Sequence, residues 1–105
     1  MYAIAIIRYR RPLEEVLALT DRHRAYLREL KAQGTLVASG PMDPRTGGIL
    51  LLHFPEGSRV LSLLDAIRDG DPYVTEGVAQ YELIPWAVNT GKDDLDRALL
   101  RAEAL

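Results

Sequence analysis

The stretch PLEEVLALTDRHRAYLRELKAQG, from Pro12 to Gly34, decides the fold because it places one long amphipathic helix between two strand-like segments. Its apolar residues recur three, four or seven positions apart, which puts them on one helix face: Val16, Leu19, Leu27 and Leu30. Pro12 suits the first helical turn, and Gly34 suits the end of a helix. His23 falls in the same stripe, where another leucine would be expected, so its imidazole is predicted to face the interior.

Strand-like segments and a second helix lie on both sides of this stretch. Branched and aromatic residues predict four strands, over residues 2–10, 35–39, 49–54 and 79–86. Helical spacing predicts a second helix that begins after Ser58 as N-cap and ends at Gly70. Gly40 and Pro41 are expected to end the second strand, and the turn-forming residues 43–48 follow. The order β-α-β-β-α-β predicts an α+β, ferredoxin-like sandwich, with both helices on one face of an antiparallel sheet.

Both faces of the two central strands are apolar. In the first strand, one face carries Ile4 and Ile6, and the other carries Ala3, Ala5 and Ile7. In the third strand, one face carries Leu50, Leu52 and Phe54, and the other carries Ile49 and Leu51. Two helices cover only one face of such a sheet, so the second face needs another cover. The simplest cover is a second copy of the chain, which predicts a homodimer whose two sheets face each other.

The C-terminal segment predicts an additional helix. Its apolar residues follow helical spacing: Leu95, Leu99, Ala102 and Leu105. Asp93 is available as a cap, and acidic residues in the first turn favour a helix start. Because so short a helix is marginal alone, we expect it to dock on its own sheet or on the partner. We therefore divide the chain into a ferredoxin-like domain, residues 1–88, and a helical extension, residues 89–105.

Length and charge exclude several classes of protein. A chain of 105 residues suits one domain with a single core. Its 13 Lys and Arg against 15 Asp and Glu leave a formal charge of −2, which gives no general attraction to nucleic acid or to an anionic membrane. No apolar stretch approaches the ~20 residues that span a bilayer. Charges follow the first apolar run, the reverse of a secretory signal, so we expect a cytoplasmic protein.

Motif analysis removes further alternatives. The absence of cysteine excludes thiol catalysis, and the unpaired spacing of His23 and His53 predicts no metal site. The sequence has no nucleophile elbow, no phosphate-binding loop and no dinucleotide fingerprint, so no cofactor is expected. The segment GGILLLHF, residues 47–54, lacks the basic and aromatic positions with which sheets of this strand order bind RNA.

An inward-facing imidazole needs a polar partner, and the best candidate is the carboxylate of Asp71. A histidine bonded to a carboxylate is a potential general acid or base, which makes His23 and Asp71 the candidate catalytic pair. Two structural alternatives stay open. His23 could be a core histidine satisfied by a backbone carbonyl or water, and Asp71 could be the N-cap of a turn that begins at Pro72. One carboxylate has enough oxygen lone pairs for both roles.

Four further residues are candidates for substrate binding. Tyr73 could donate its hydroxyl to an enolate or phenolate, and Gly40 with Pro41 could shape a pocket wall. Arg8, on the same strand face as Ile6, could hold an anionic group. Each also has a structural explanation, namely tyrosine packing, strand termination and an exposed strand end.

Two segments resemble the YCII-related family of small dimeric proteins: DRHRAYLRELKAQGTLVASGP, residues 21–41, and DPYVTEGVAQYELIPW, residues 71–86. Family members are similar in placing a histidine on the first helix, Gly-Pro after the second strand, and Asp-Pro-Tyr or Asp-Pro-Phe before a glycine and the last strand. The matching residues here are His23, Gly40, Pro41, Asp71, Pro72, Tyr73 and Gly77. The resemblance spans Met1 to Trp86 and implies a dimer of ferredoxin-like subunits.

The resemblance also implies small-molecule chemistry without a cofactor, because the family and the similar dimeric α/β barrels include dehydrochlorinases and muconolactone isomerases. The enzyme hypothesis is a lyase or isomerase in which His23 moves a substrate proton and Asp71 orients the imidazole. The rival hypothesis is a non-catalytic dimer that binds a small ligand and signals to a partner, for which the C-terminal helix is the best support. The rival predicts an apolar pocket that tolerates His23→Gln.

Overall fold

The computed structural model describes the backbone of residues 1–104 and the side chains of residues 1–100. Its strands are β1 Tyr2–Tyr9, β2 Leu36–Pro41, β3 Gly47–His53 and β4 Ala79–Trp86. Its helices are α1 Leu13–Leu17, α2 Thr20–Ala32, α3 Val60–Gly70, α4 Pro72–Thr75 and α5 Lys92–Ala104. Leu105 and the side chain of Ala102, which were predicted to complete the C-terminal apolar stripe, lie outside the described residues.

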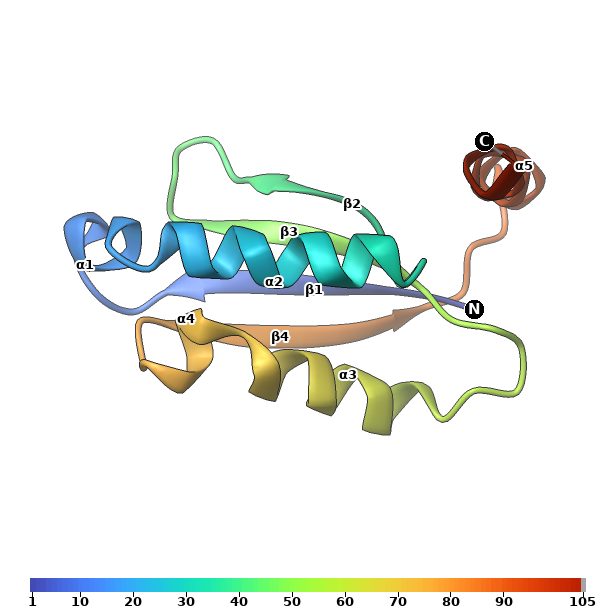
Figure 1. Ribbon diagram of the computed structural model, residues 1–105. Coiled ribbons are helices and arrows are strands. Elements are labelled where there is room, and N and C mark those ends of the chain that lie inside the picture. The colour runs from blue at the N-terminus through green and yellow to red at the C-terminus, as the bar shows by residue number, and fades with distance from the viewer. Residues whose placement is uncertain (105) are drawn as a thin grey trace.

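The strands form one antiparallel sheet in the order β2-β3-β1-β4. Helices α2 and α3 lie across the same face of this sheet, whereas α5 stands apart from them near the N-terminus (Figure 1). The predicted ferredoxin-like α+β fold with an additional C-terminal helix is therefore confirmed.

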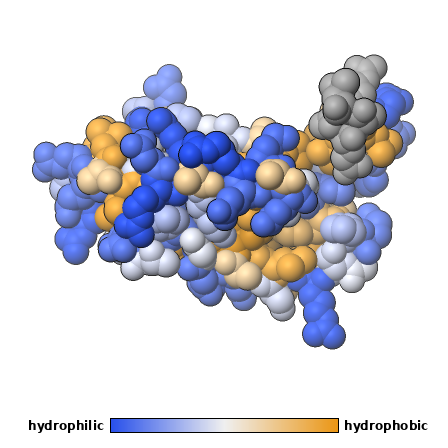
Figure 2. Space-filling model, viewed as in Figure 1, coloured by the Kyte–Doolittle hydropathy of each residue, from blue (hydrophilic) through white to orange (hydrophobic). Residues whose placement is uncertain are grey.

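The hydrophobic core fills the space between the sheet and its helices. Strand alternation sends five residues of the central strands inward, each 2% exposed or less: Ala3, Ala5, Ile7, Leu50 and Leu52. Val16 of α1 and Leu64 of α3 are fully buried against them. Full burial of a large aliphatic side chain contributes about 1.5–3 kcal/mol, so this side of the sheet dominates the stability of the fold. The outward surface of α2 is hydrophilic (Figure 2).

The stretch from Pro12 to Gly34 forms two helices, α1 and α2, and not the single helix predicted. The two helices meet at Leu19, whose N–H donates to the carbonyl of Val16, three residues earlier, at 3.0 Å. The hydroxyl of Thr20 donates to the same carbonyl at 3.1 Å. The carbonyl of Val16 therefore accepts from the Leu19 N–H and the Thr20 hydroxyl, in place of the Thr20 N–H that a continuous helix would use, which accounts for the interruption.

Strand β2 extends through Gly40 and Pro41, which were predicted to end it, and pairs both residues with β3. Gly47 and Gly48, predicted as turn residues, begin β3. A Cβ on Gly48 would lie 3.1 Å from the carbonyl oxygen of Gly40, and one on Gly47 would lie 1.8 Å from that of Ile7. The two glycines therefore allow β3 to approach both neighbouring strands.

Two predicted helix caps are wrong. The hydroxyl of Ser58 donates to the carbonyl of Pro55 at 2.6 Å and closes a turn, so α3 begins at Val60 without a side-chain cap. Asp93 lies inside the first turn of α5, where a negative charge favours the helix N-terminus.

The face of the sheet opposite α2 and α3, which we call the open face, is apolar and only partly covered. Ile4, Ile6 and Leu51 on this face are half-buried, and Ile49 is 43% exposed. Helix α5 packs on one end of the open face, where the hydroxyl of Tyr2 donates to Asp96 at 2.6 Å. The described helices are all too short or too polar to cross a lipid bilayer.

Candidate active site

His23 and Asp71 are in direct contact. Helix α2 points the imidazole toward the end of α3, and its Nδ1 lies 2.9 Å from each carboxylate oxygen of Asp71. The Asp71 side chain is fully buried, and that of His23 is 11% exposed. The pairing deduced from an imidazole in an apolar stripe is therefore present, and the alternative of a core histidine bonded to a backbone carbonyl is excluded at Nδ1.

Asp71 has three hydrogen-bond donors around its carboxylate. Besides His23, the backbone N–H of Tyr73 donates to Oδ1 at 2.9 Å, and the hydroxyl of Tyr81 donates to Oδ2. The first of these bonds makes Asp71 the N-cap of α4, as the Asp-Pro sequence predicted, and Pro72 is the first residue of that helix. One carboxylate thus caps a helix and contacts the histidine, as its oxygen lone pairs allow.

The environment of Asp71 keeps the neighbouring phenols neutral. Burial raises the pKa of Tyr81, and the charge of Asp71 and the hydrogen bond to it raise that pKa further. Burial also raises the pKa of Tyr73, although its hydrogen bond with Thr20 opposes the rise. Tyr81 therefore serves as a neutral donor that stabilises a buried carboxylate.

The contact with Asp71 determines the tautomer of a neutral His23. A carboxylate only accepts hydrogen bonds, so Nδ1 carries the proton and Nε2 keeps its lone pair. Among the described residues, Nε2 has no hydrogen-bond partner. Every described side-chain nitrogen that is fully buried does have a partner, so Nε2 is not fully buried. His23 lines a cavity, so the basic nitrogen is accessible from that side.

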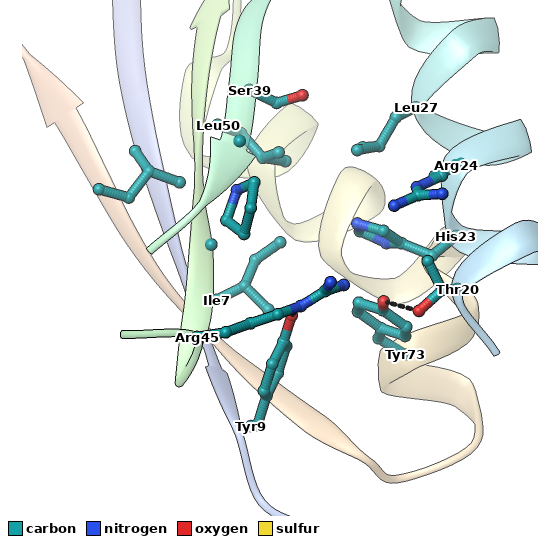
Figure 3. Close-up of a pocket in the computed structure, with 14 residues that line it drawn as sticks. Ile7, Tyr9, Thr20, His23, Arg24, Leu27, Ser39, Arg45, Leu50 and Tyr73 are labelled. Atoms are coloured by element: carbon teal, nitrogen blue, oxygen red, sulfur yellow. Dashed lines mark hydrogen bonds between the residues drawn. The ribbon is translucent and has the colours of Figure 1, made fainter. Parts of the chain in front are cut away.

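Tyr73 supports the imidazole by stacking. The two rings lie 3.9 Å apart between centroids, with only 7° between their planes. The hydroxyl of Tyr73 lies 2.7 Å from the hydroxyl of Thr20, the one hydrogen bond drawn in Figure 3. Since Thr20 gives its single proton to the carbonyl of Val16, Tyr73 is the donor in this bond. The predicted donation from Tyr73 to a substrate enolate therefore requires this bond to break.

A cavity of about 220 Å³ opens beside the imidazole, between α2 and the β2–β3 hairpin (Figure 3). Gly40 and Pro41 form part of its wall, as predicted, together with Tyr73. Its apolar walls come from Ile7, Leu27 and Leu50, and its cationic groups come from Arg24 and Arg45. The volume suits a ligand smaller than the drug-sized molecules that occupy roughly 300–1,000 Å³.

Arg8, predicted to bind substrate, is not part of this cavity. It follows Ile7 on β1, so strand alternation turns it to the open face, where it pairs with Glu82 at 2.9 Å. The prediction was wrong because the sequence shows two apolar strand faces and does not say which one the helices cover.

Three residues of the site were missed, namely Thr20, Arg45 and Tyr81. Two had a detectable signal, since Thr20 lies one turn before His23, and Tyr81 lies on the same inward face of β4 as Ala79 and Leu83. Arg45 had none, because its position depends on how a loop folds. The described residues contain no cluster of three or more His, Asp or Glu side chains suited to a metal ion.

Comparison with known proteins agrees with the fold. No protein with a curated description matches the sequence. Among solved structures, the chain is similar to 5-chloro-2-hydroxyhydroquinone dehydrochlorinase (TftG) from Burkholderia phenoliruptrix AC1100, solved in complex with 2,5-dihydroxybenzoquinone. The match has a TM-score of 0.68 at 22% identity and covers 85% of this chain and 96% of that one. The model of the YCII-related domain matches residues 1–87, most of the length, and the chain therefore belongs to the YCII-related family.

Proposed function

We propose that this chain is a small-molecule lyase or isomerase in which His23 is the general base and acid and Asp71 orients it. One observation carries the proposal: Nδ1 is held by a buried carboxylate at 2.9 Å while Nε2 opens on a ligand-sized cavity. This arrangement presents a lone pair to the cavity and stabilises the imidazolium that forms when a proton arrives.

The reaction begins when Nε2 takes a proton from a carbon next to a carbonyl or hydroxyl-bearing carbon of the substrate. The electron pair of the broken C–H bond then becomes part of an enolate or a new double bond. In a lyase, a leaving group departs with its own electron pair. In an isomerase, the imidazolium returns the proton to a different carbon. Either route needs only the imidazole as proton carrier, so the proposal includes no cofactor.

The solved neighbour supports the lyase version. It is named a dehydrochlorinase, and its fold is shared by this chain. Removal of hydrogen chloride from a ring requires a base beside a carbon-bound or hydroxyl proton, and His23 lines the cavity in which such a ring would bind. The rival proposal, a small-ligand-binding regulatory dimer, draws support from α5, which adds a surface away from the cavity.

We further propose that the protein acts as a homodimer with the open faces of two sheets in contact. Support comes from Ile4, Ile6, Ile49 and Leu51, which form an apolar surface that α2 and α3 do not cover. An interface of standard size buries about 800 Å² on each partner.

The test is proton exchange and product formation with a panel of small oxygenated rings and lactones in D₂O, followed by NMR. The panel includes 5-chloro-2-hydroxyhydroquinone, with chloride release as a second readout. We expect the wild type to turn over at least one compound, and His23→Ala to lose a factor of about 10²–10⁴ while keeping its fold. His53→Ala is the matched control, because His53 lies outside the cavity.

Two further results separate the rival proposals. Asp71→Asn should lower turnover while the variant keeps its fold, since the carboxylate is the only partner of His23 at Nδ1 among the described residues. A folded His23→Gln variant that keeps full turnover, or a wild type that binds ligands but exchanges no C–H proton, would favour the regulatory module.

A further inference from the structure

Two guanidinium groups converge on the cavity from opposite sides. Arg24 extends from α2, one residue after His23, and Arg45 extends from the connection between β2 and β3. In Figure 3 both side chains reach toward the imidazole, Arg45 across the mouth between Tyr9 and His23. The cavity therefore has two cations beside its one basic nitrogen.

The two arginines have no acidic partner among the described residues, a property that they share with Arg28 but not with Arg8, Arg22 and Arg68. Arg8, Arg22 and Arg68 each lie within 4 Å of a carboxylate, in pairs such as Arg22 with Glu76 at 3.6 Å. Neither Arg24 nor Arg45 forms such a pair with any described residue. Arg45 is oriented by a neutral group, since its Nε donates to the hydroxyl of Tyr9 at 3.4 Å. Tyr73, a second phenol, also interacts with this guanidinium, so both described side chains that contact Arg45 are uncharged at neutral pH.

No compensating negative charge reaches the cavity. None of the described residues that line it is Asp or Glu, and the charge of Asp71 lies behind the imidazole, where three donors already bind it. The remaining wall combines the apolar side chains of Ile7, Leu27 and Leu50 with uncharged hydroxyl groups such as that of Thr20. A pair of cations against an apolar wall attracts a compact organic anion, and a guanidinium binds a carboxylate through two parallel hydrogen bonds.

Building on the proposed function, we infer that the substrate is a small organic acid whose carboxylate is bound by Arg45 and Arg24. Its apolar body lies against Ile7 and Leu50, which brings a carbon of the body to Nε2 of His23. The arginines act as specificity residues: they select an anion and set its distance from the base. The cavity volume of about 220 Å³ limits the occupant to a single ring or a short chain.

Binding of benzoate and of benzamide tests this inference, because the two probes share a shape and differ in charge. With isothermal titration calorimetry on the full chain, we expect benzoate to bind at least about tenfold more tightly than benzamide, as charge-assisted hydrogen bonds require. Arg45→Met should remove most of this preference, because it weakens the binding of benzoate much more than that of benzamide. Arg24→Met should reduce it in part. Arg28→Met is the matched control, since Arg28 lies on α2 but does not line the cavity.

The inference is overturned if the two probes bind equally, if benzoate does not bind at millimolar concentration, or if Arg45→Met leaves the preference intact. Should Arg45→Met fail to fold, Arg45→Lys and Arg24→Met provide the same comparison. The binding assay is independent of turnover. Selective benzoate binding by a protein that exchanges no proton would contradict only the proposed reaction, whereas turnover confined to uncharged substrates would contradict only the inference.

Discussion

The two faces of the sheet carry similar residues in different surroundings. On β3, Leu50 and Leu52 point to the helices and are at most 1% exposed, while Ile49, beside Leu50 in the chain, points to the open face and is 43% exposed. Both sets are aliphatic and both lie on central strands. What separates them is the presence of a cover, so residue type alone does not determine which face becomes the core.

Polar groups on the two faces differ in the same way. On the covered side, the charge of Asp71 is buried and fully hydrogen-bonded, and no buried side-chain nitrogen or oxygen among the described residues lacks a partner. On the open side, Arg8 and Glu82 form a pair in which each side chain is 53% exposed. Exposed pairs contribute about 0–1 kcal/mol, so only the covered side combines polar chemistry with a rigid packed support.

The largest expected effect comes from removing a side chain on the covered face. Leu52→Ala should lower the free energy of unfolding by about 2–5 kcal/mol, because the packed side chains around it cannot move far enough to fill the cavity. Urea denaturation measures this change. Ile49→Ala is the comparison on the open face, and its smaller cost should grow with protein concentration, since its burial depends on a partner. Equal losses at every concentration would mean that the two faces are energetically alike.

The second prediction concerns the open face. Ile49→Glu should weaken a homodimer at least about tenfold, which is about 1.4 kcal/mol, because each copy would bury an unpaired carboxylate at the interface. Light scattering should show the wild type at twice the 11.7 kDa chain mass and the variant moving toward one chain. Leu61→Glu on α3, at a residue 67% exposed, is the control and should leave the mass unchanged. A wild type that is monomeric at micromolar concentration contradicts the facing-sheet proposal.

The smallest effect is a pH dependence at the end of the open face. Burial, together with the hydrogen bond to Asp96, raises the pKa of Tyr2 from 10.0 to about 12. The folded chain therefore keeps this proton after the unfolded chain has lost it. The resulting contribution to stability is complete below the unfolded pKa and decreases as the pH rises from about 10 to about 12.

Denaturation of the wild type and of Tyr2→Phe across this pH range isolates the contribution of Tyr2, because the other tyrosines are common to both proteins. The difference in stability between the two should shrink as the pH rises. Asp96→Asn should lower the Tyr2 pKa only in part, since burial is its largest cause. A difference that is constant with pH would show that α5 does not hold Tyr2 as described.

The fold could be predicted because its signals are local. The strand and helix order follows from residue periodicity, and the α4 cap follows from Asp71 and Pro72, which are adjacent in the sequence. The contact of His23 with Asp71 could also be deduced, because an inward imidazole requires a polar partner and few were available. The interruption before Thr20 could not, since it depends on one hydroxyl competing for one carbonyl.

The rest of the site depends on long-range geometry. Tyr81 reaches Asp71 only because β4 lies beside α3 and α4, and Arg45 reaches the cavity only through the path of the β2–β3 connection. The error at Arg8 has the same origin, because the assignment of a strand face to the interior requires the position of the helices. Sequence periodicity relates the residues of one element to each other, whereas a cavity is formed by several elements.

The stacking of His23 on Tyr73 has a consequence for the fate of a transferred proton. The ring is clamped by a parallel phenol 3.9 Å away and by two oxygens at Nδ1, so it cannot turn over to exchange its two nitrogens. A proton taken at Nε2 therefore leaves only through the cavity, which the bound molecule itself occupies. In D₂O, the share of solvent deuterium at the carbon that receives the proton would therefore report how often water reaches Nε2 between removal and return, whereas a lyase would release the proton to solvent when its product departs.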